Sequence, residues 1–547
     1  MANPSLQIGN SNWAIKEDNL LGYSTAGTRF VPQPITMTRA SAGTRVNSSG
    51  LVETVELLGS ELVTNGDFEN NVIGWNKFKS NATESWNAGG YLDFTKTGVS
   101  GRLGSDVLIE TNKTYKISVN VISLGGILDL YVGLSDFESP YAGVSSTPLV
   151  VGTNTFYLTY PGSASSKGVY LQSAGSNYFG LTASIDSISV KESTKNNLAR
   201  VDYDGTASSL LVEPERTNLI TSSEDFSGWS KNQIVVTTIS ETSPLGDTVS
   251  KVVGANNSTL KLLYKNNFIN SSKVFSVLVK KSGYDFASIR IGSGGGTVIF
   301  DLVNGVVGDM TSGLVSTDYK IEDYGSGWFR LSARFPAFTG DTYMSITGVA
   351  SNSIYSTTGN GVDGILLAYA QIEEGSYPTS YIPTSGSTVT RNQETYTKTG
   401  ISDLINSEEG VLFLEMAALA DDGTNRYISI NDGSTQNYVY FRFMSTSNRV
   451  LTRTVVAGVT INTLQITISD TTAFNKYAIK WKSGDYAFWI NGVEVGTDSS
   501  STIFSADVLN QIDFDFPTAS GNFPSKVKQL QVYDTSLSDE QSAALTS

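Results

Sequence analysis

The sequence predicts an all-β protein built from tandem antiparallel β-sandwiches (jelly rolls), preceded by a small N-terminal region. Apolar and polar residues alternate in short runs, and Gly, Asn, Asp and Ser separate these runs. The clearest run is 477–496, which the turn residues Ser483–Gly484–Asp485 and Asn491–Gly492 divide into two successive hairpins. Helical spacing is scarce, and the tail 538–547 is one of the few places where a short helix is expected. Many short strands without intervening helices are typical of β-sandwiches.

Length and composition limit the possible functions. A chain of 547 residues corresponds to about three or four domains. The net charge of −15 comes without any Lys/Arg cluster, so we expect no nucleic-acid partner. Cysteine and histidine are both absent, which excludes disulfides, thiolate nucleophiles, Ser-His-Asp triads and imidazole zinc sites. We therefore expect no enzyme, although Asp, Glu, Tyr, Lys and Arg are available for catalysis.

The sequence is expected to fold as a soluble protein. No apolar run approaches the ~18 residues that a membrane-spanning helix needs. The N-terminus lacks the basic start and apolar stretch of a signal peptide. We expect no membrane insertion.

A short motif occurs twice. "NGDFENNVIGW" (65–75) opens a segment that closes at 183–193, and "SSEDFSGW" (222–229) opens one that closes at 365–376. We interpret these segments as two copies of one sandwich type, in which Phe68 and Trp75 belong to the core. Chance similarity between two all-β domains is the alternative.

Asp67 and Glu69 of this motif flank Phe68. In an extended strand, residues two apart lie on one face, and two carboxylates with backbone carbonyls suit Ca²⁺. An exposed acidic strand end is the alternative explanation.

Four longer strings resemble a family of tailed-bacteriophage virion proteins. They are "MTRASAGTRVNSSGLVETV" (37–55), "ARVDYDGTASSLLVEPERTNLITSSEDFSGWS" (199–230), "GWFRLS" (327–332) and "AQIEEGSYPTSYIPTSGSTVTR" (370–391). Members are fibre or adhesin-like structural proteins with concanavalin-like or laminin-G-like C-terminal domains. The start, "NSNWAIKEDNLLGY" (10–23), is similar to the N-termini of related proteins from phages of Bacteroidetes-type hosts.

One departure from that family suggests an inserted module. The first string usually runs almost directly into the second, whereas residues 58–193 separate them here and resemble a jelly-roll carbohydrate-binding module. Such insertions cost little loop-closure entropy. We expect 35–56 and 199–220 to pack together, the alternative being that both are linkers. The expected parts are 1–57 (virion attachment), 58–193 (inserted module), 194–221 (connector), 222–394 (second jelly roll) and 395–547 (concanavalin/laminin-G-like sandwich).

The resemblance also implies site residues in the inserted module. In similar modules, the "GDFE" start and an Asp of the last strand hold a structural calcium, which would be bound here by Asp67, Glu69 and Asp186. Ala368 stands at the position of Asp186 in the second copy, so that site is expected to be degraded. Sugar-binding sandwiches use aromatic platforms, and the module offers Trp86, Tyr91, Tyr131, Tyr141 and Tyr178 besides Trp75. We select Trp86, Tyr91 and Tyr131 as glycan-binding candidates.

Together these features imply a non-enzymatic virion structural protein, a tail or head fibre with no catalytic and no cofactor-binding residues. Its partners would be host-surface glycans and, through the N-terminal region, other virion proteins, with a homotrimer as the usual fibre assembly. It would be made in the host cytoplasm and located on the virion. The alternatives are a capsular polysaccharide depolymerase, a purely structural capsid or tail decoration protein, and a bacterial surface adhesin.

Overall fold

The computed structural model confirms tandem antiparallel β-sandwiches and divides the chain into two compact units. Residues 56–195 form the inserted module, and residues 1–55 with 196–547 form the main unit. The structure describes residues 3–10, 13–16, 19–26, 29–127, 129–135, 145, 147–160, 168–173, 179–244, 246, 248–266, 271–292, 296–311, 319–335, 343–355, 358–517 and 523–547. Within these ranges, no helix has the length and apolarity that crossing a bilayer requires.

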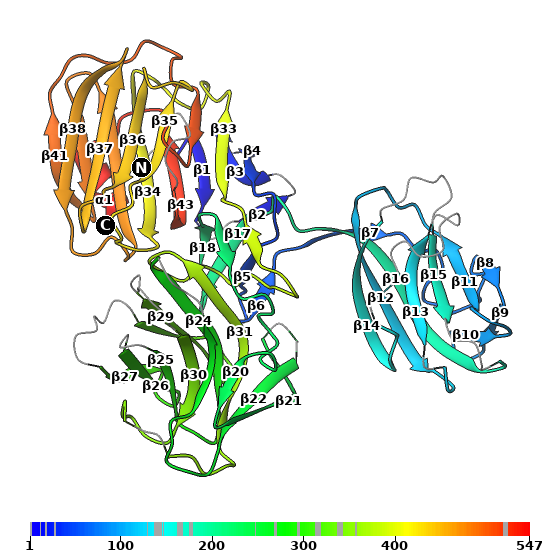
Figure 1. Ribbon diagram of the computed structural model, residues 1–547. Helices are drawn as coiled ribbons and strands as arrows, with labels where there is room; N and C mark the ends of the chain where they lie inside the picture. The colour runs from blue at the N-terminus through cyan, green and yellow to red at the C-terminus, as the bar shows by residue number, and fades with distance from the viewer. Residues whose placement is uncertain are drawn as a thin grey trace. The chain divides into compact units, whose positions relative to one another are not determined.

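The inserted module is a sandwich of two sheets (Figure 1). The first has the order β14-β12-β16-β10-β9, with β7 also paired to β16, and the second has the order β13-β15-β11-β8. The strands are β7 (Leu57–Glu61), β8 (Lys77–Ser80), β9 (Ala82–Asn87), β10 (Tyr91–Lys96), β11 (Arg102–Asp106), β12 (Thr114–Ser123), β13 (Leu130–Ser135), β14 (Gly152–Thr159), β15 (Gly168–Ser173) and β16 (Thr182–Thr194). Alternate residues of β12 face the core, beginning with Tyr115 and Ile117.

The module begins and ends on neighbouring strands. β7 is antiparallel to the end of β16, so that Leu57 lies opposite Thr194. The chain therefore enters and leaves the module side by side, as an insertion into a surface connection requires.

The second sandwich lies in the main unit, within residues 220–374. Its sheets have the orders β20-β23-β30-β25-β26-β27 and β21-β22-β31-β24-β29-β28. The strands are β20 (Ser230–Asn232), β21 (Ile234–Thr242), β22 (Thr248–Gly254), β23 (Leu262–Asn266), β24 (Lys273–Ser282), β25 (Phe286–Ile291), β26 (Gly296–Asp301), β27 (Val306–Met310), β28 (Tyr319–Asp323), β29 (Trp328–Phe335), β30 (Tyr343–Val349) and β31 (Gly364–Glu374). Phe275, Val277 and Val279 of β24 enter its core.

The third sandwich contains strands from both ends of the chain. One layer runs β38-β37-β36-β35-β42-β33-β4-β3, and the other runs β41-β40-β39-β34-β43. The strands are β1 (Leu6–Gly9), β2 (Ala14–Lys16), β3 (Asn19–Ala26), β4 (Arg29–Thr38), β33 (Thr395–Thr399), β34 (Glu409–Ala418), β35 (Arg426–Asn431), β36 (Tyr438–Phe443), β37 (Arg449–Val456), β38 (Val459–Thr467), β39 (Asn475–Lys482), β40 (Tyr486–Ile490), β41 (Val493–Asp498), β42 (Gln511–Asp513) and β43 (Ser525–Tyr533).

This arrangement differs from the expected separate N-terminal region 1–57. The N-terminal strands are not a region of their own, because β1 pairs with β43 and β4 pairs with β33 (Figure 1). Leu6 and Ile8 are fully buried in the core of the third sandwich. The backbone N–H and C=O groups at the edges of β1 and β4 need partners, and the edges of β43 and β33 provide them.

Two local expectations at the C-terminus are confirmed. β39, β40 and β41 form the two hairpins expected for 477–496. The short helix of the tail is α1 (Asp539–Thr546), with Ser538 as its N-cap. The Ser538 hydroxyl accepts from the Gln541 backbone N–H, and the Gln541 side chain accepts from the Ser538 N–H, which is a capping box.

A connector packs between the second and third sandwiches. It consists of the hairpin β5–β6, the hairpin β17–β18 and the strand pair β19–β32. Their bounds are β5 (Thr44–Val46), β6 (Val52–Thr54), β17 (Arg200–Asp204), β18 (Ala207–Val212), β19 (Arg216–Asn218) and β32 (Val389–Arg391). The residues that precede the module contact those that follow it. For example, the Val46 N–H donates to Asp202 Oδ1 at 2.8 Å.

Candidate functional sites

The carboxylates of the opening motif lie in a bend rather than in a strand. Phe68 has a φ of 53°, in the left-handed region, so Asp67 and Glu69 do not share the face of an extended strand as the sequence suggested. The bend turns Phe68 fully into the core and leaves the two carboxylates exposed. The burial of one ring thus overrides the alternation of a strand.

Asp186, the third expected calcium ligand, is already engaged. It lies half-buried in β16, where its Oδ2 accepts from Asn120 Nδ2 at 2.9 Å. Among the residues that the structure describes, no three acidic side chains are gathered as a metal would require. The structure therefore does not bring the three predicted ligands together, and calcium binding stays a prediction from the resemblance.

The aromatic residues of the repeated motif belong to the cores of their sandwiches. Phe68 and Trp75 are fully buried with ring centroids 5.1 Å apart, and Trp75 Nε1 donates to the Asn65 carbonyl at 3.0 Å. In the second sandwich, Phe226 and Trp229 are buried with the same separation of 5.1 Å. The shared part of the motif is therefore a packing element in both copies.

The hairpin β9–β10 places Trp86 and Tyr91 on opposite faces of its sheet. Trp86 lies opposite Leu92, a core residue, whereas Tyr91 lies opposite Asn87. Trp86 is 42% exposed at the sheet edge, and its Nε1 donates to the Phe68 carbonyl at 2.8 Å. The two aromatic residues consequently do not form one platform.

Tyr131 lies in the other sheet of the module, on a face that turns away from the core. It stands opposite Gln172 of β15, which in turn stands opposite Arg102 of β11. The neighbouring residues Val132, Leu171 and Leu103 all point into the core, so this row of three points outward. Arg102 Nη2 donates to Gln172 Oε1 at 3.0 Å. We call these three residues the Tyr131 row.

Tyr170 lies on the same side of the sheet as the Tyr131 row but is fully buried. It stands between Gly133 and Gly104, and a Cβ at Gly133 would lie 2.5 Å from its ring. The Arg102 guanidinium lies 4.9 Å from the centre of the ring. Gln172 is only 7% exposed, so Tyr131 and Arg102, both half-buried, are the solvent-accessible groups of this face. Of the other aromatic residues considered, Tyr141 and Tyr178 lie outside the described residues.

A buried ion network holds the connector of the main unit together. Glu394 binds Arg39 and Arg200, and Glu213 binds Arg200 and Arg391, with N–O distances of 2.5–2.9 Å. All five side chains are at most 4% exposed. Burial alone raises the pKa of Glu213, but Arg391 and Arg200 outweigh it and hold that pKa far below its usual range. This network was not predicted from the sequence, although all its members but Glu394 stand in the strings that carry the resemblance.

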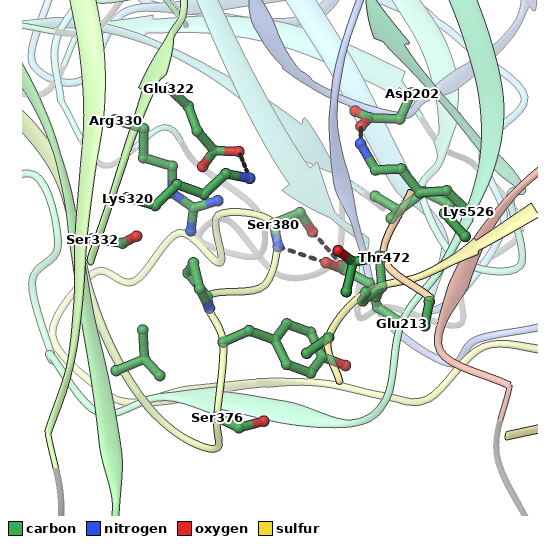
Figure 2. A pocket seen from close by; sticks show the side chains of 18 of the residues that line it. Asp202, Glu213, Lys320, Glu322, Arg330, Ser332, Ser376, Ser380, Thr472 and Lys526 are labelled. Atoms are coloured by element: carbon green, nitrogen blue, oxygen red, sulfur yellow. Dashed lines mark hydrogen bonds and ion pairs between the residues drawn. The ribbon is translucent and has the colours of Figure 1, made fainter. Parts of the chain in front are cut away.

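The connector and both sandwiches of the main unit line a partly open cavity of about 1090 Å³. Figure 2 shows Lys320, Glu322 and Arg330 along one side, and Asp202 with Lys526 on another. The first three come from β28 and β29, on the outward face of the second sandwich, while Lys526 comes from β43 of the third. Several tyrosines complete the lining: Tyr319, Tyr324, Tyr369, Tyr377 and Tyr381. This cavity was not predicted from the sequence, because its lining comes from distant parts of the chain.

Two of the carboxylates in the cavity, Glu322 and Asp202, are paired with lysines. Lys320 Nζ lies 2.6 Å from Glu322 Oε1, and Lys526 Nζ lies 2.8 Å from Asp202 Oδ2. Burial by itself raises the pKa of Glu322, but Lys320 and Arg330 outweigh it, so the pKa is lowered. Burial lowers the pKa of Lys526, but Asp202 and Glu322 outweigh it and the pKa is raised. The shifted pKa values keep Glu322 and Lys526 charged at neutral pH.

The fold and these sites define an all-β protein with polar and aromatic surfaces on its sandwiches. No protein-family profile matches the chain, and no curated protein matches it. Solved structures to which it is similar include the CBM40 module of the Ruminococcus gnavus IT-sialidase bound to α2,3-sialyllactose (15% identity, 26% of this chain and 83% of that one, TM-score 0.23). A second is the CBM22-1–CBM22-2 tandem of Paenibacillus barcinonensis Xyn10C (12% identity, 58% of this chain and 98% of that one, TM-score 0.22). A third is sheep galectin-11 with glycerol (8% identity, 25% of this chain and 95% of that one, TM-score 0.19). At these scores the similarities assign neither a family nor a ligand.

Proposed function

We propose that this chain is a non-catalytic, glycan-binding structural protein of a phage virion, whose inserted module contacts a host-surface glycan. The observation that carries the binding function is the Tyr131 row, in which the half-buried Tyr131 ring and Arg102 guanidinium lie on an outward sheet face and the nearly buried Gln172 between them accepts from Arg102. An aromatic ring can stack on the apolar face of a pyranose, while planar polar groups bind its hydroxyls.

The paired state of the carboxyl groups supports a binding role rather than hydrolysis. A glycosidase needs one carboxyl whose pKa is raised so that it can donate a proton. The pKa values of Glu213, Glu322 and Asp422, which line the main cavity, are all lowered by their cationic or hydrogen-bonding partners against the effect of burial. These groups stay ionised and are poor general acids.

The virion part of the proposal rests on the four strings that resemble phage virion proteins and on the contacts between three of them in the folded chain. Arg39, Arg200 and Arg391 come from three of these strings and meet in the buried ion network. We propose that the resulting connector carries the module on a virion surface, bound to other virion proteins. A homotrimer would present three modules, and linked weak sites gain avidity through effective concentration.

Binding of the full-length protein to an array of bacterial surface polysaccharides tests the glycan-binding function. We expect a signal that falls at least tenfold in the Arg102→Ala/Tyr131→Ala variant. Tyr91→Ala is the matched control, because Tyr91 is also half-buried on an outward face, but in the opposite sheet. No binding to any polysaccharide contradicts the function, and loss only in the Tyr91 variant moves the site to the other sheet.

Two further measurements test the remaining parts. Release of reducing ends from host capsule would contradict the non-catalytic role and favour the depolymerase. Labelling of purified phage particles by an antibody against this chain is expected, and its absence contradicts the virion assignment. Light scattering tests the trimer, for which we expect a mass three times that of the monomer.

A further inference from the structure

We infer that the cavity of the main unit is a second saccharide site, which binds the vicinal diols of a neutral oligosaccharide. The choice of a saccharide rests on the proposed function, but the residues are separate from those of the Tyr131 row. All of them belong to the main unit, whereas the row belongs to the inserted module.

Each of the two ion pairs in the cavity presents a donor beside an acceptor. The Lys320 ammonium lies 2.6 Å from the Glu322 carboxylate, and the Lys526 ammonium lies 2.8 Å from the Asp202 carboxylate. The oxygens of two neighbouring sugar hydroxyls are separated by a distance similar to the N–O distance of these ion pairs. Each hydroxyl can donate and accept a hydrogen bond. A diol can therefore accept from the ammonium and donate to the carboxylate of the same pair. Hydrogen bonds to charged groups are about twice as strong as those between neutral groups.

The second pair is fixed before any ligand arrives. Asp202 Oδ1 accepts from the Val46 N–H at 2.8 Å, so its Oδ2 is held toward Lys526. Asp202 is 8% exposed, and Lys526 is one-third exposed. A preorganised pair loses little side-chain entropy when a ligand binds, which favours affinity.

Neutral tyrosines supply rings and hydroxyl donors around these pairs. Burial raises the pKa of Tyr377 to about 12, and burial also raises the pKa of Tyr324 well above its usual value. Both rings line the cavity. The lining also includes the hydroxyl groups of Ser332, Ser376 and Thr472, which Figure 2 labels. Rings, hydroxyls and paired charges are the combination that a polyhydroxylated ligand requires.

Size and charge argue against other ligand classes. A volume of about 1090 Å³ is at the upper end of small-molecule sites, which suits several sugar residues. The exposed Asp204 and the ionised Glu322 repel phosphate-rich ligands, and the charged pairs disfavour a lipid chain.

Titration calorimetry of the full-length protein with neutral oligosaccharides of five sugar residues tests the inference. The variant Lys320→Ala/Glu322→Ala removes one pair, and Ala473→Trp fills the cavity from the opposite wall, where Ala473 is exposed. We expect each to weaken binding at the cavity at least tenfold. The control is Lys281→Ala/Asp285→Ala, an ion pair of the second sandwich with both side chains about half exposed and outside the cavity lining.

The chemistry of the ligand gives an independent readout. Periodate cleaves vicinal diols, so an oxidised and reduced pentasaccharide should lose its binding to the cavity. The measurement is made in the Arg102→Ala/Tyr131→Ala background, which isolates the cavity from the module. Unchanged affinity in both cavity variants, or equal affinity for the oxidised sugar, overturns the inference.

The two proposals fail differently. If the Arg102→Ala/Tyr131→Ala variant binds no oligosaccharide while the wild type does, the cavity site is wrong and the proposed function stands. If that variant binds with wild-type affinity and the cavity variants do not, the site lies in the cavity and the Tyr131 row is wrong. If the wild type binds no sugar, both are wrong.

Discussion

Arg200 and Glu394 form a two-pronged ion pair inside the main unit, although 194 residues separate them in the sequence. Arg200 Nε lies 2.8 Å from Oε1 and Nη2 lies 2.6 Å from Oε2, and both side chains are fully buried. The geometry matches the planar fork of a guanidinium. Glu394 also binds Arg39, so this pair joins chain segments on both sides of the inserted module.

Replacing Glu394 by Gln should destabilise the main unit by about 3–5 kcal/mol, because it leaves Arg39 and Arg200 buried with too little negative charge. Urea unfolding followed by tryptophan fluorescence measures this loss. Lys281→Ala, which breaks an exposed ion pair of the second sandwich, should cost less than about 1 kcal/mol. Equal effects of the two substitutions would show that the network does not stabilise the fold.

The same network predicts a dependence on acid. Burial alone raises the pKa of Glu394, but Arg200 and Arg39 outweigh it, and the pKa values of Glu394 and Glu213 are both below the ordinary 4.5. The unfolded chain then binds more protons than the folded one, so stability falls as the pH drops below about 4.5. Each group contributes up to about 1.4 kcal/mol per pH unit. Thermal unfolding between pH 7 and pH 3 should show the decline, with a shallower slope in Glu394→Gln.

The two tryptophans near the opening motif should respond differently to truncation. Trp75→Ala empties a fully buried site and should cost the inserted module about 3–5 kcal/mol. Trp86→Ala removes a partly exposed ring and one hydrogen bond to the Phe68 carbonyl, at a cost of about 1 kcal/mol. Chemical denaturation of the module gives both values. A larger effect of Trp86→Ala would contradict the assignment of Trp75 to the core.

The inserted module should fold alone. Its core is built entirely from its own residues, and β7 and β16 bring its two ends together. We expect residues 56–195 to unfold cooperatively as an isolated protein. The remaining chain, with Val55 joined to Asn196 by a short Gly/Ser linker, should keep its own unfolding midpoint. A large loss of stability in the shortened chain would show that the module is part of the main fold.

Calcium binding is a prediction that the isolated module can test directly. If Asp67, Glu69 and Asp186 bind the ion, calcium at 100 times its dissociation constant should stabilise the module by about 2.7 kcal/mol relative to EDTA. Asp186→Asn should reduce that effect. An unfolding midpoint that does not respond to calcium would favour the alternative of an exposed acidic bend.

Local features could be predicted from the sequence because neighbouring residues determine them. The hairpins of 477–496 follow from alternation and from Asn491–Gly492, and the α1 cap follows from Ser538. Asp67 and Glu69 were misplaced because the alternation rule does not foresee that Phe68 adopts a left-handed conformation to reach the core.

Long-range features could not be predicted in the same way. An isolated Arg39 or Glu394 gives no sign that the two meet, since they are 355 residues apart in the sequence. The cavity is likewise formed by strands of two sandwiches and a connector, and its ion pair Lys526–Asp202 spans 324 residues. The pairing between β1 and β43 depends on which sheet edge is left unpaired in the folded protein, and the residues of β1 alone do not specify that edge.

The contact between β1 and β43 has a consequence for synthesis on the ribosome. Ser5 and Val532 are 527 residues apart, and the Ser5 N–H donates to the Val532 carbonyl. While the chain is being translated, the inserted module and the second sandwich can fold as they emerge, but the first strands must wait for the last. Until β43 is synthesised, β1 and β34 lack the strand that pairs with both of them. Their unpaired backbone groups can then pair with other chains. A nascent chain stalled before residue 525 should therefore recruit chaperones, whereas full release should free it from them.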